Sequence, residues 1–171
     1  MLFNTNAKLG ALSGLVSGVL LGVLLQVFAI KTPAGSRVIL MEVINPMSGS
    51  NSLLLGWFFY LFDSILMGAI FGFLLGTKAL NFKSGLKYAF LCSLGWWILG
   101  GIFFMPIFLG LSIFSPQSLE PIQPVALQSL IGHILFGLIF GGVFVALKAK
   151  TRKPEMREIH READRSRFKA S

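Results

Sequence analysis

Acidic residues and cysteines are both scarce in this chain. Seven Asp and Glu stand against fifteen Lys and Arg in 171 residues, and charged residues make up only 13% of the sequence, whereas a soluble domain carries roughly 25%. Between Met1 and Leu147 the only acids are Glu42, Asp63 and Glu120. The single cysteine, Cys92, excludes an internal disulfide and a metal site built from several cysteines. The composition therefore excludes an ordinary soluble domain.

Catalytic motifs are also missing. The sequence has no His-Glu-x-x-His, no Gly-x-Ser-x-Gly and no phosphate-binding loop, and no two Asp residues fall in its apolar runs. We therefore expect a protein that is not an enzyme. No metal site is predicted.

Long apolar runs dominate what is present. A membrane-spanning helix needs about 20 largely apolar residues. Four runs are long enough, and we expect helices over residues 7–30, 53–77, 86–113 and 125–147. They predict an all-α, polytopic integral membrane protein, with a four-helix transmembrane domain over residues 1–149 and a basic, charged tail over residues 150–171.

Glycines recur every four residues within these runs, which places each set on one helix face. Such small-residue faces let helix backbones approach closely in lipid. The expected glycine-zipper packing residues are Gly10, Gly14, Gly18, Gly22, Gly68, Gly72, Gly76, Gly137 and Gly141. Packing within the bundle is the main interpretation. The alternative is that the first set faces another subunit, in a homo-oligomer or beside other membrane proteins.

Basic residues indicate the orientation. Lys8 precedes the first run, three lysines surround the link between the second and third, and nine Lys and Arg follow Leu147. The positive-inside rule then places both termini on the cytoplasmic side of a cell membrane. We expect the basic tail to meet anionic lipid headgroups rather than nucleic acid.

Two ionisable residues fall within the apolar runs, where they are costly and often functional. Asp63 lies fifteen residues before Lys78, and His133 lies fifteen residues before Lys148. We expect both at one depth in a polar cluster that also contains Gln26, Ser64 and Ser129. The favoured interpretation is a hydrogen-bonded tie between helices. The alternative is a proton or cation site in an outward-facing polar pocket.

His133 has small neighbours on its helix face, at Ser129 and Gly137. An axial ligand for haem or chlorophyll is therefore a further, less favoured interpretation. The other histidine, His160, is in the tail, so a ligand pair would need a second chain. No cofactor is expected.

Residues 63–72 and 132–141 are similar, with Ile, Leu, Gly, Ile, Phe and Gly at matching places. Two interpretations stay open, a parallel repeat of two helices or a chance match between apolar segments.

The segment from Trp96 to Pro106, followed by the one from His133 to Gly141, resembles small multi-pass membrane proteins of the YagU type. The resemblance covers residues 96–147 and implies a four-helix membrane architecture, without an established chemistry. That family often has a histidine in the helix that corresponds to residues 53–77, where this chain has Asp63 and Ser64.

From these features we expect a packing or accessory subunit of a larger membrane assembly. The alternative is a small channel or transporter for protons, ions or a small solute, working through the pocket around Asp63 and His133.

Overall fold

Four long helices make up most of the structure, a computed structural model that describes residues 2–26, 29–31, 37–39, 52–104, 107 and 123–170. They are α1 (Leu2–Gln26), α3 (Leu53–Leu75), α4 (Phe82–Ile98) and α7 (Gln123–Ala170). A π-helical segment, η2 (Leu99–Phe104), follows α4 directly. The all-α class expected from the sequence is confirmed.

Three of the helices are long and apolar enough to cross a membrane. Within the described residues these candidate spans are Thr5–Gln26, Leu53–Leu75 and Ser129–Arg152. The chain is accordingly a plausible multi-pass membrane protein in contact with a lipid bilayer. A fourth span is predicted over residues 86–113, of which residues 86–98 lie in α4 and 99–104 in η2. Residues 105, 106 and 108–113 of that prediction lie outside the described part of the chain.

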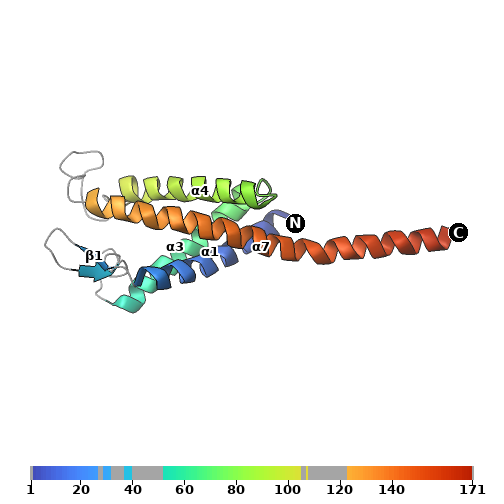
Figure 1. Cartoon of the computed structure of the whole chain (residues 1–171), viewed down its shortest axis with the longest axis horizontal. Helices are drawn as coiled ribbons and strands as arrows, with labels where there is room; N and C mark the ends of the chain where they lie inside the picture. Colours follow the sequence, from blue (N-terminus) through green and yellow to red (C-terminus); the bar gives the residue numbers. More distant parts are fainter. Residues whose placement is uncertain are drawn as a thin grey trace.

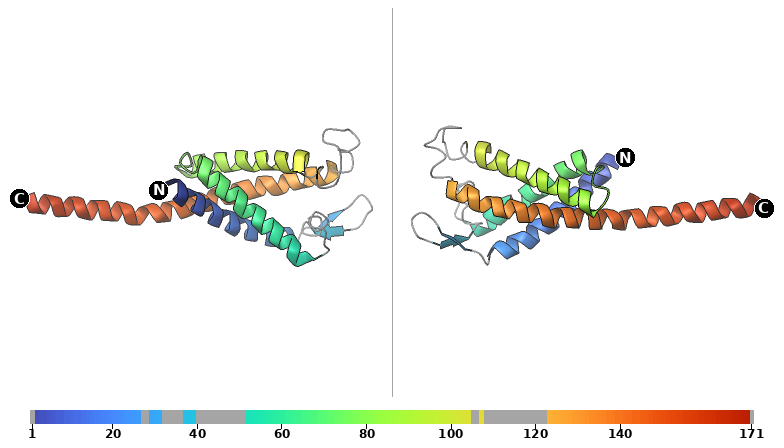
Figure 2. Two further views of the ribbon diagram at one scale, coloured as in Figure 1. Left: turned by 180° about the vertical axis from the view of Figure 1, so that it is seen from behind. Right: turned by 45° about the horizontal axis from the view of Figure 1, so that its top comes forward.

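The helices are arranged in two pairs. α1 packs along α3, and α4 packs along α7. Figure 1 and both views of Figure 2 show that the pairs converge near the N-terminus and diverge toward the end that carries β1. Beyond the point of convergence, α7 continues alone to the C-terminus.

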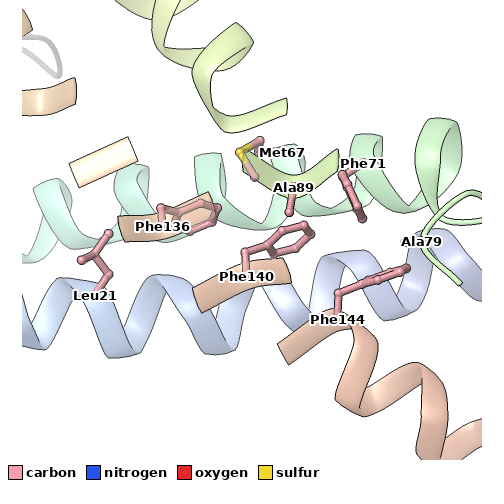
Figure 3. Close-up of a cluster of buried hydrophobic side chains, with 8 residues drawn as sticks. All are labelled: Leu21, Met67, Phe71, Ala79, Ala89, Phe136, Phe140 and Phe144. Atoms are coloured by element: carbon pink, nitrogen blue, oxygen red, sulfur yellow. The ribbon is translucent and has the colours of Figure 1, made fainter. Parts of the chain in front are cut away.

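Buried aromatic side chains fill the space where the pairs meet (Figure 3). Phe71 of α3 makes edge-to-face contacts with Phe140 and Phe144 of α7, at ring-centroid distances of 4.9 and 5.1 Å. All three rings are fully buried. In lipid, where the hydrophobic effect between helices is weak, such close packing is what holds the pairs together.

Two helix ends differ from the sequence-based expectation. The first helix ends at Gln26 rather than near residue 30, because Ala29–Lys31 forms strand β1, paired antiparallel with β2 (Arg37–Ile39). Ile30 lies opposite Val38, and β-branched residues favour such pairing. The predicted boundary between the membrane domain and the tail, at residues 149 and 150, falls inside the continuous helix α7.

The link between the two pairs is a tight turn over residues 76–81. Asn81 caps α4 by accepting a hydrogen bond from the Ser84 backbone N–H at 2.9 Å, and the Ser84 hydroxyl accepts one from the Asn81 N–H at 3.1 Å. This reciprocal capping box satisfies backbone groups that the first helical turn leaves without partners. It fixes where α4 begins after the turn.

Candidate functional site: the polar residues between the helix pairs

Asp63 stands near the middle of α3, ten residues after Leu53 and twelve before Leu75. Its side chain is exposed at the surface of the bundle. Both carboxylate oxygens accept hydrogen bonds from Trp96 Nε1 on α4, at 3.1 and 3.2 Å. The indole therefore links the two helix pairs through Asp63.

His133 lies on α7 and is half-buried. Its Nδ1 is 2.9 Å from the backbone carbonyl oxygen of Ser129, one turn earlier on the same helix. Since a carbonyl only accepts, Nδ1 carries the proton in this contact, and in the neutral imidazole Nε2 then carries the lone pair. Among the described residues, the structure records no hydrogen bond or ion pair between His133 and Asp63.

Two serines hold α7 to α4 beside this histidine. The Ser93 hydroxyl donates to the backbone oxygen of His133 at 2.7 Å, and Trp97 Nε1 donates to the Ser129 hydroxyl at 3.1 Å. Both contacts are interhelical polar ties, each contributing on the order of 1 kcal/mol. They hold the backbone segment that carries the imidazole.

The remaining residues of the expected polar cluster lie apart from these contacts. Ser64 is buried against α1 and donates to the carbonyl of Tyr60, one turn earlier, at 2.8 Å. Gln26 is the last residue of α1. Asp63 is bonded to Trp96 of α4, and Ser129, which His133 contacts, is bonded to Trp97, whereas Ser64 faces α1 within its own helix pair.

Hydroxyl groups without partners occur nearby. Among the described side chains, Ser17 Oγ and the Tyr60 hydroxyl are buried and have no hydrogen-bond partner. Sequence analysis missed Tyr60 and the two tryptophans, because aromatic residues are common in membrane helices and only their tertiary placement shows which polar atoms they meet.

The glycines of α1 and α3 lie against the facing helix. A Cβ on Gly10 would overlap the backbone oxygen of Gly68, and one on Gly14 would overlap that of Ser64. An added Cβ would also contact neighbouring atoms at four further glycines. It would meet Ser64 at Gly18, Trp57 at Gly22, Asn6 at Gly72, and both Gly72 and Asn6 at Gly76. In the second pair, Gly137 and Gly141 lie against α4, with nearest atoms 3.0 Å from the added Cβ.

Lys148 is a further polar residue, at the end where the pairs converge. It is only 6% exposed, although it is a lysine. Its Nζ donates to the backbone oxygens of Gly76 and Ala79, the latter at 3.2 Å. A cation from α7 therefore satisfies the carbonyls of the α3 C-cap residue and of the turn that follows, close to the end of α3 where the helix dipole favours positive charge.

Comparison with known proteins adds no assignment. No protein-family model matches the chain, and neither the curated proteins nor the solved structures contain a match. The resemblance over residues 96–147 stays a prediction. The described residues also hold no group of three or more His, Cys, Asp or Glu that could bind a metal ion.

Proposed function

We propose that the chain is a non-enzymatic accessory subunit of a larger membrane assembly. It would sit in the cell membrane and present one surface to a partner in the bilayer and another in the cytoplasm. The observation that carries the proposal is the continuation of α7 beyond the bundle.

α7 is 48 residues long, about twice what a membrane span requires. Its candidate span ends at Arg152, and eighteen further residues, 153–170, continue the helix. Figures 1 and 2 show this part running away from the other helices. Helices in proteins are stabilised mainly by the packing of one face against other elements. A binding partner along this segment would supply that packing.

The glycine faces support a role for the zipper inside the chain rather than between chains. The backbones of α1 and α3 approach through Gly10, Gly14 and Gly68, where any side chain would overlap the other helix. These contacts support α3, rather than another subunit, as the element that packs on this face. Partners would bind elsewhere on the bundle.

The two helix pairs also support the parallel repeat. Gly14 lies against the Ser64 backbone oxygen in the first pair, and Ser93 donates to the His133 backbone oxygen in the second. Ser64 and His133 occupy matching places in the two similar segments, 63–72 and 132–141. Both pairs would then use one packing arrangement twice, related by an axis along the membrane normal.

The orientation is part of the proposal, with both termini cytoplasmic. Cysteines at Ser118 and Ser166 test it in a Cys92→Ser background. An impermeant thiol reagent applied to intact cells should label the cysteine at position 118 and should not label the cysteine at position 166. Labelling at Ser166 would reverse the orientation.

Co-purification tests the accessory role. The full chain, extracted in mild detergent, should carry defined membrane or cytoplasmic partners in constant ratio. A chain that stops after Arg152 should insert normally and lose the cytoplasmic partners. Elution of the full chain alone and only as a monomer would contradict the accessory role.

A transport role is the second candidate, favoured by the exposed Asp63 carboxylate on one helix pair and the half-buried His133 imidazole on the other. Proteoliposome flux, measured across pH for the wild type, Asp63→Asn and His133→Gln, tests it. A carrier site would lose flux in the Asn variant while folding normally. Equal leak in all three proteins would exclude this role.

A further inference from the structure

Positive charge is concentrated at the end of the bundle where the two helix pairs converge (Figure 1). Seven Lys and Arg lie on the turn and the helix segments of this end, at positions 8, 78, 83, 87, 148, 150 and 152. Among the described residues from 2 to 152, Asp63 is the only acid, and it lies near the middle of α3. The described part of the bundle therefore offers no acidic side chain to neutralise these cations.

Lys148 holds two exposed cations near one place. Its Nζ donates to the backbone oxygens of Gly76 and Ala79, which lie on either side of Lys78 in the turn. Arg152 follows Lys148 by one helical turn, so it lies on the same face of α7, about 6 Å further along. Lys78 and Arg152 are exposed, whereas Lys148 is buried and ties α7 to the turn. The two exposed cations thus extend from backbone segments that Lys148 joins.

The ends of α1 and α4 lie against the same two elements. Asn6, two residues before Lys8, contacts the turn, because a Cβ added at Gly76 would be 2.8 Å from the Asn6 side chain. A Cβ added at Gly142 of α7 would be 3.8 Å from the ring of Phe82, the first residue of α4. All four helices therefore contribute to this end of the bundle.

This end also lies at the level of lipid headgroups. Each candidate span has one terminal residue here, at Thr5, Leu75 and Arg152. Lys8 is three residues inside the first span, about 4.5 Å along the helix, and Lys78 follows the second span by three residues. Basic side chains near helix ends extend their charged groups into the headgroup region. We call the exposed basic residues of this end the basic collar: Lys8, Lys78, Lys83, Lys87, Lys150 and Arg152.

The tail is less suited to binding anions than the collar is. Residues 153–170 hold six Lys and Arg but also four Asp and Glu, which leaves a net charge of +2. Acids and bases alternate along this segment, so each cation has an anion within one helical turn to pair with. The unbalanced charge of the chain belongs to the collar.

An anionic phospholipid has the chemistry and the location that fit the collar. Its phosphate lies at the boundary of the hydrocarbon core, and basic groups between membrane helices on that boundary bind such headgroups. Arg152 can donate two N–H groups to one phosphate, and Lys78 adds a point charge. A zwitterionic headgroup fits less well, because its own cation is repelled by the collar.

We propose that the basic collar binds the headgroup of an anionic phospholipid, with Lys78 and Arg152 at the centre of the site. The sequence alone assigns this interaction to the tail, whereas the structure assigns it to the bundle. The inference is independent of the accessory role, because the ligand is a lipid and no second protein is needed.

Lipid binding to the purified full-length protein tests the proposal. Native mass spectrometry of the protein in detergent gives the dissociation constants of phosphatidylglycerol and phosphatidylcholine, which differ in net charge. The wild type should bind phosphatidylglycerol at least tenfold more tightly. One basic residue beside an anionic headgroup changes binding by about fivefold, so the double variant Lys78→Gln with Arg152→Gln should lose about 25-fold for phosphatidylglycerol and little for phosphatidylcholine.

A charge-preserving variant guards against loss of the fold. Lys78→Arg with Arg152→Lys keeps both cations at exposed positions, so its affinity for phosphatidylglycerol should stay within about threefold of the wild type. If this variant loses binding as completely as the neutral one, charge is not what the two residues supply and the proposal is wrong.

Two further double variants remove the same charge elsewhere. Lys31→Gln with Arg37→Gln acts at the opposite end of the bundle, where these residues face each other in the β1–β2 pair. Arg161→Gln with Arg165→Gln acts in the tail. Both should bind phosphatidylglycerol like the wild type. Equal loss in either of them would show that net charge or the tail, rather than the collar, attracts the lipid.

Two other results would also overturn the proposal. Equal affinity of the wild type for the two lipids would mean that no anionic headgroup is preferred. Displacement of phosphatidylglycerol by millimolar inorganic phosphate would identify a soluble anion as the ligand. Neither result bears on the accessory role, which co-purification of protein partners tests separately.

Discussion

Replacing Lys148 by methionine is the most direct test of what joins α7 to the turn between the helix pairs. Nζ donates to the backbone oxygens of Gly76 and Ala79 and lies 5.8 Å from the centre of the Phe144 ring. Methionine keeps an unbranched apolar chain of similar length, so the packing against Phe144 survives. The two carbonyls lose their donor.

The expected loss follows from these contacts. A hydrogen bond from a charged donor contributes about 1.5–3 kcal/mol, and two of them would give about 3–6 kcal/mol. Removing a buried ammonium also relieves its desolvation cost, which offsets part of that sum. We expect a net loss of about 2–4 kcal/mol in the free energy of unfolding, or roughly 5–15 °C in Tm for a chain of this size.

The assay is thermal unfolding of the purified protein in detergent, with Lys150→Met as the control. Lys150 is exposed on the same helix, and its substitution should change stability by less than about 0.5 kcal/mol. Lys148→Met should unfold at clearly lower temperature than this control. Equal Tm values for the two variants would refute the conclusion that Lys148 stabilises the turn.

Hydropathy predicted the position of α3 from the apolar run alone. The expected helix over residues 53–77 corresponds to α3 at Leu53–Leu75. An apolar run of that length has one stable solution in a bilayer, a helix that satisfies its own backbone. This helix can therefore be predicted without knowledge of the tertiary structure.

Lys148 and Trp96 show where such reasoning stops. Positive charge near the end of an apolar run predicts a membrane boundary, and this boundary is all that the sequence predicts for Lys148. Its burial depends on the turn of α3 into α4 coming within reach, which no local pattern encodes. Likewise, Asp63 predicted a costly polar site, but its partner is an indole on a helix 33 residues away.

The ends of the helices were harder still. The predicted boundary between residues 149 and 150 falls inside α7, which continues to Ala170 even through Pro154, although proline removes one backbone donor. The cost of one proline is local, whereas the turns on either side propagate the helix cooperatively. The strands β1 and β2 have only three residues each. An alternating pattern of apolar and polar residues cannot distinguish such short strands from the apolar run before them.

Three substitutions test the packing, with thermal unfolding as the common measurement. Ser93→Ala removes the hydroxyl that donates to the α7 backbone and should cost about 1 kcal/mol. Phe140→Ala empties the fully buried centre of the aromatic cluster and should cost about 3 kcal/mol or more, whereas Phe58→Ala, at a side chain that is 61% exposed, should cost little. Gly14→Leu places a branched side chain where even a Cβ would overlap the α3 backbone, so α1 and α3 must separate. Because backbone cannot yield as a side chain can, we expect this variant to lose more stability than Val16→Leu, which enlarges an exposed position on the same helix. Equal stability of the two would mean that the α1 glycines do not lie against α3.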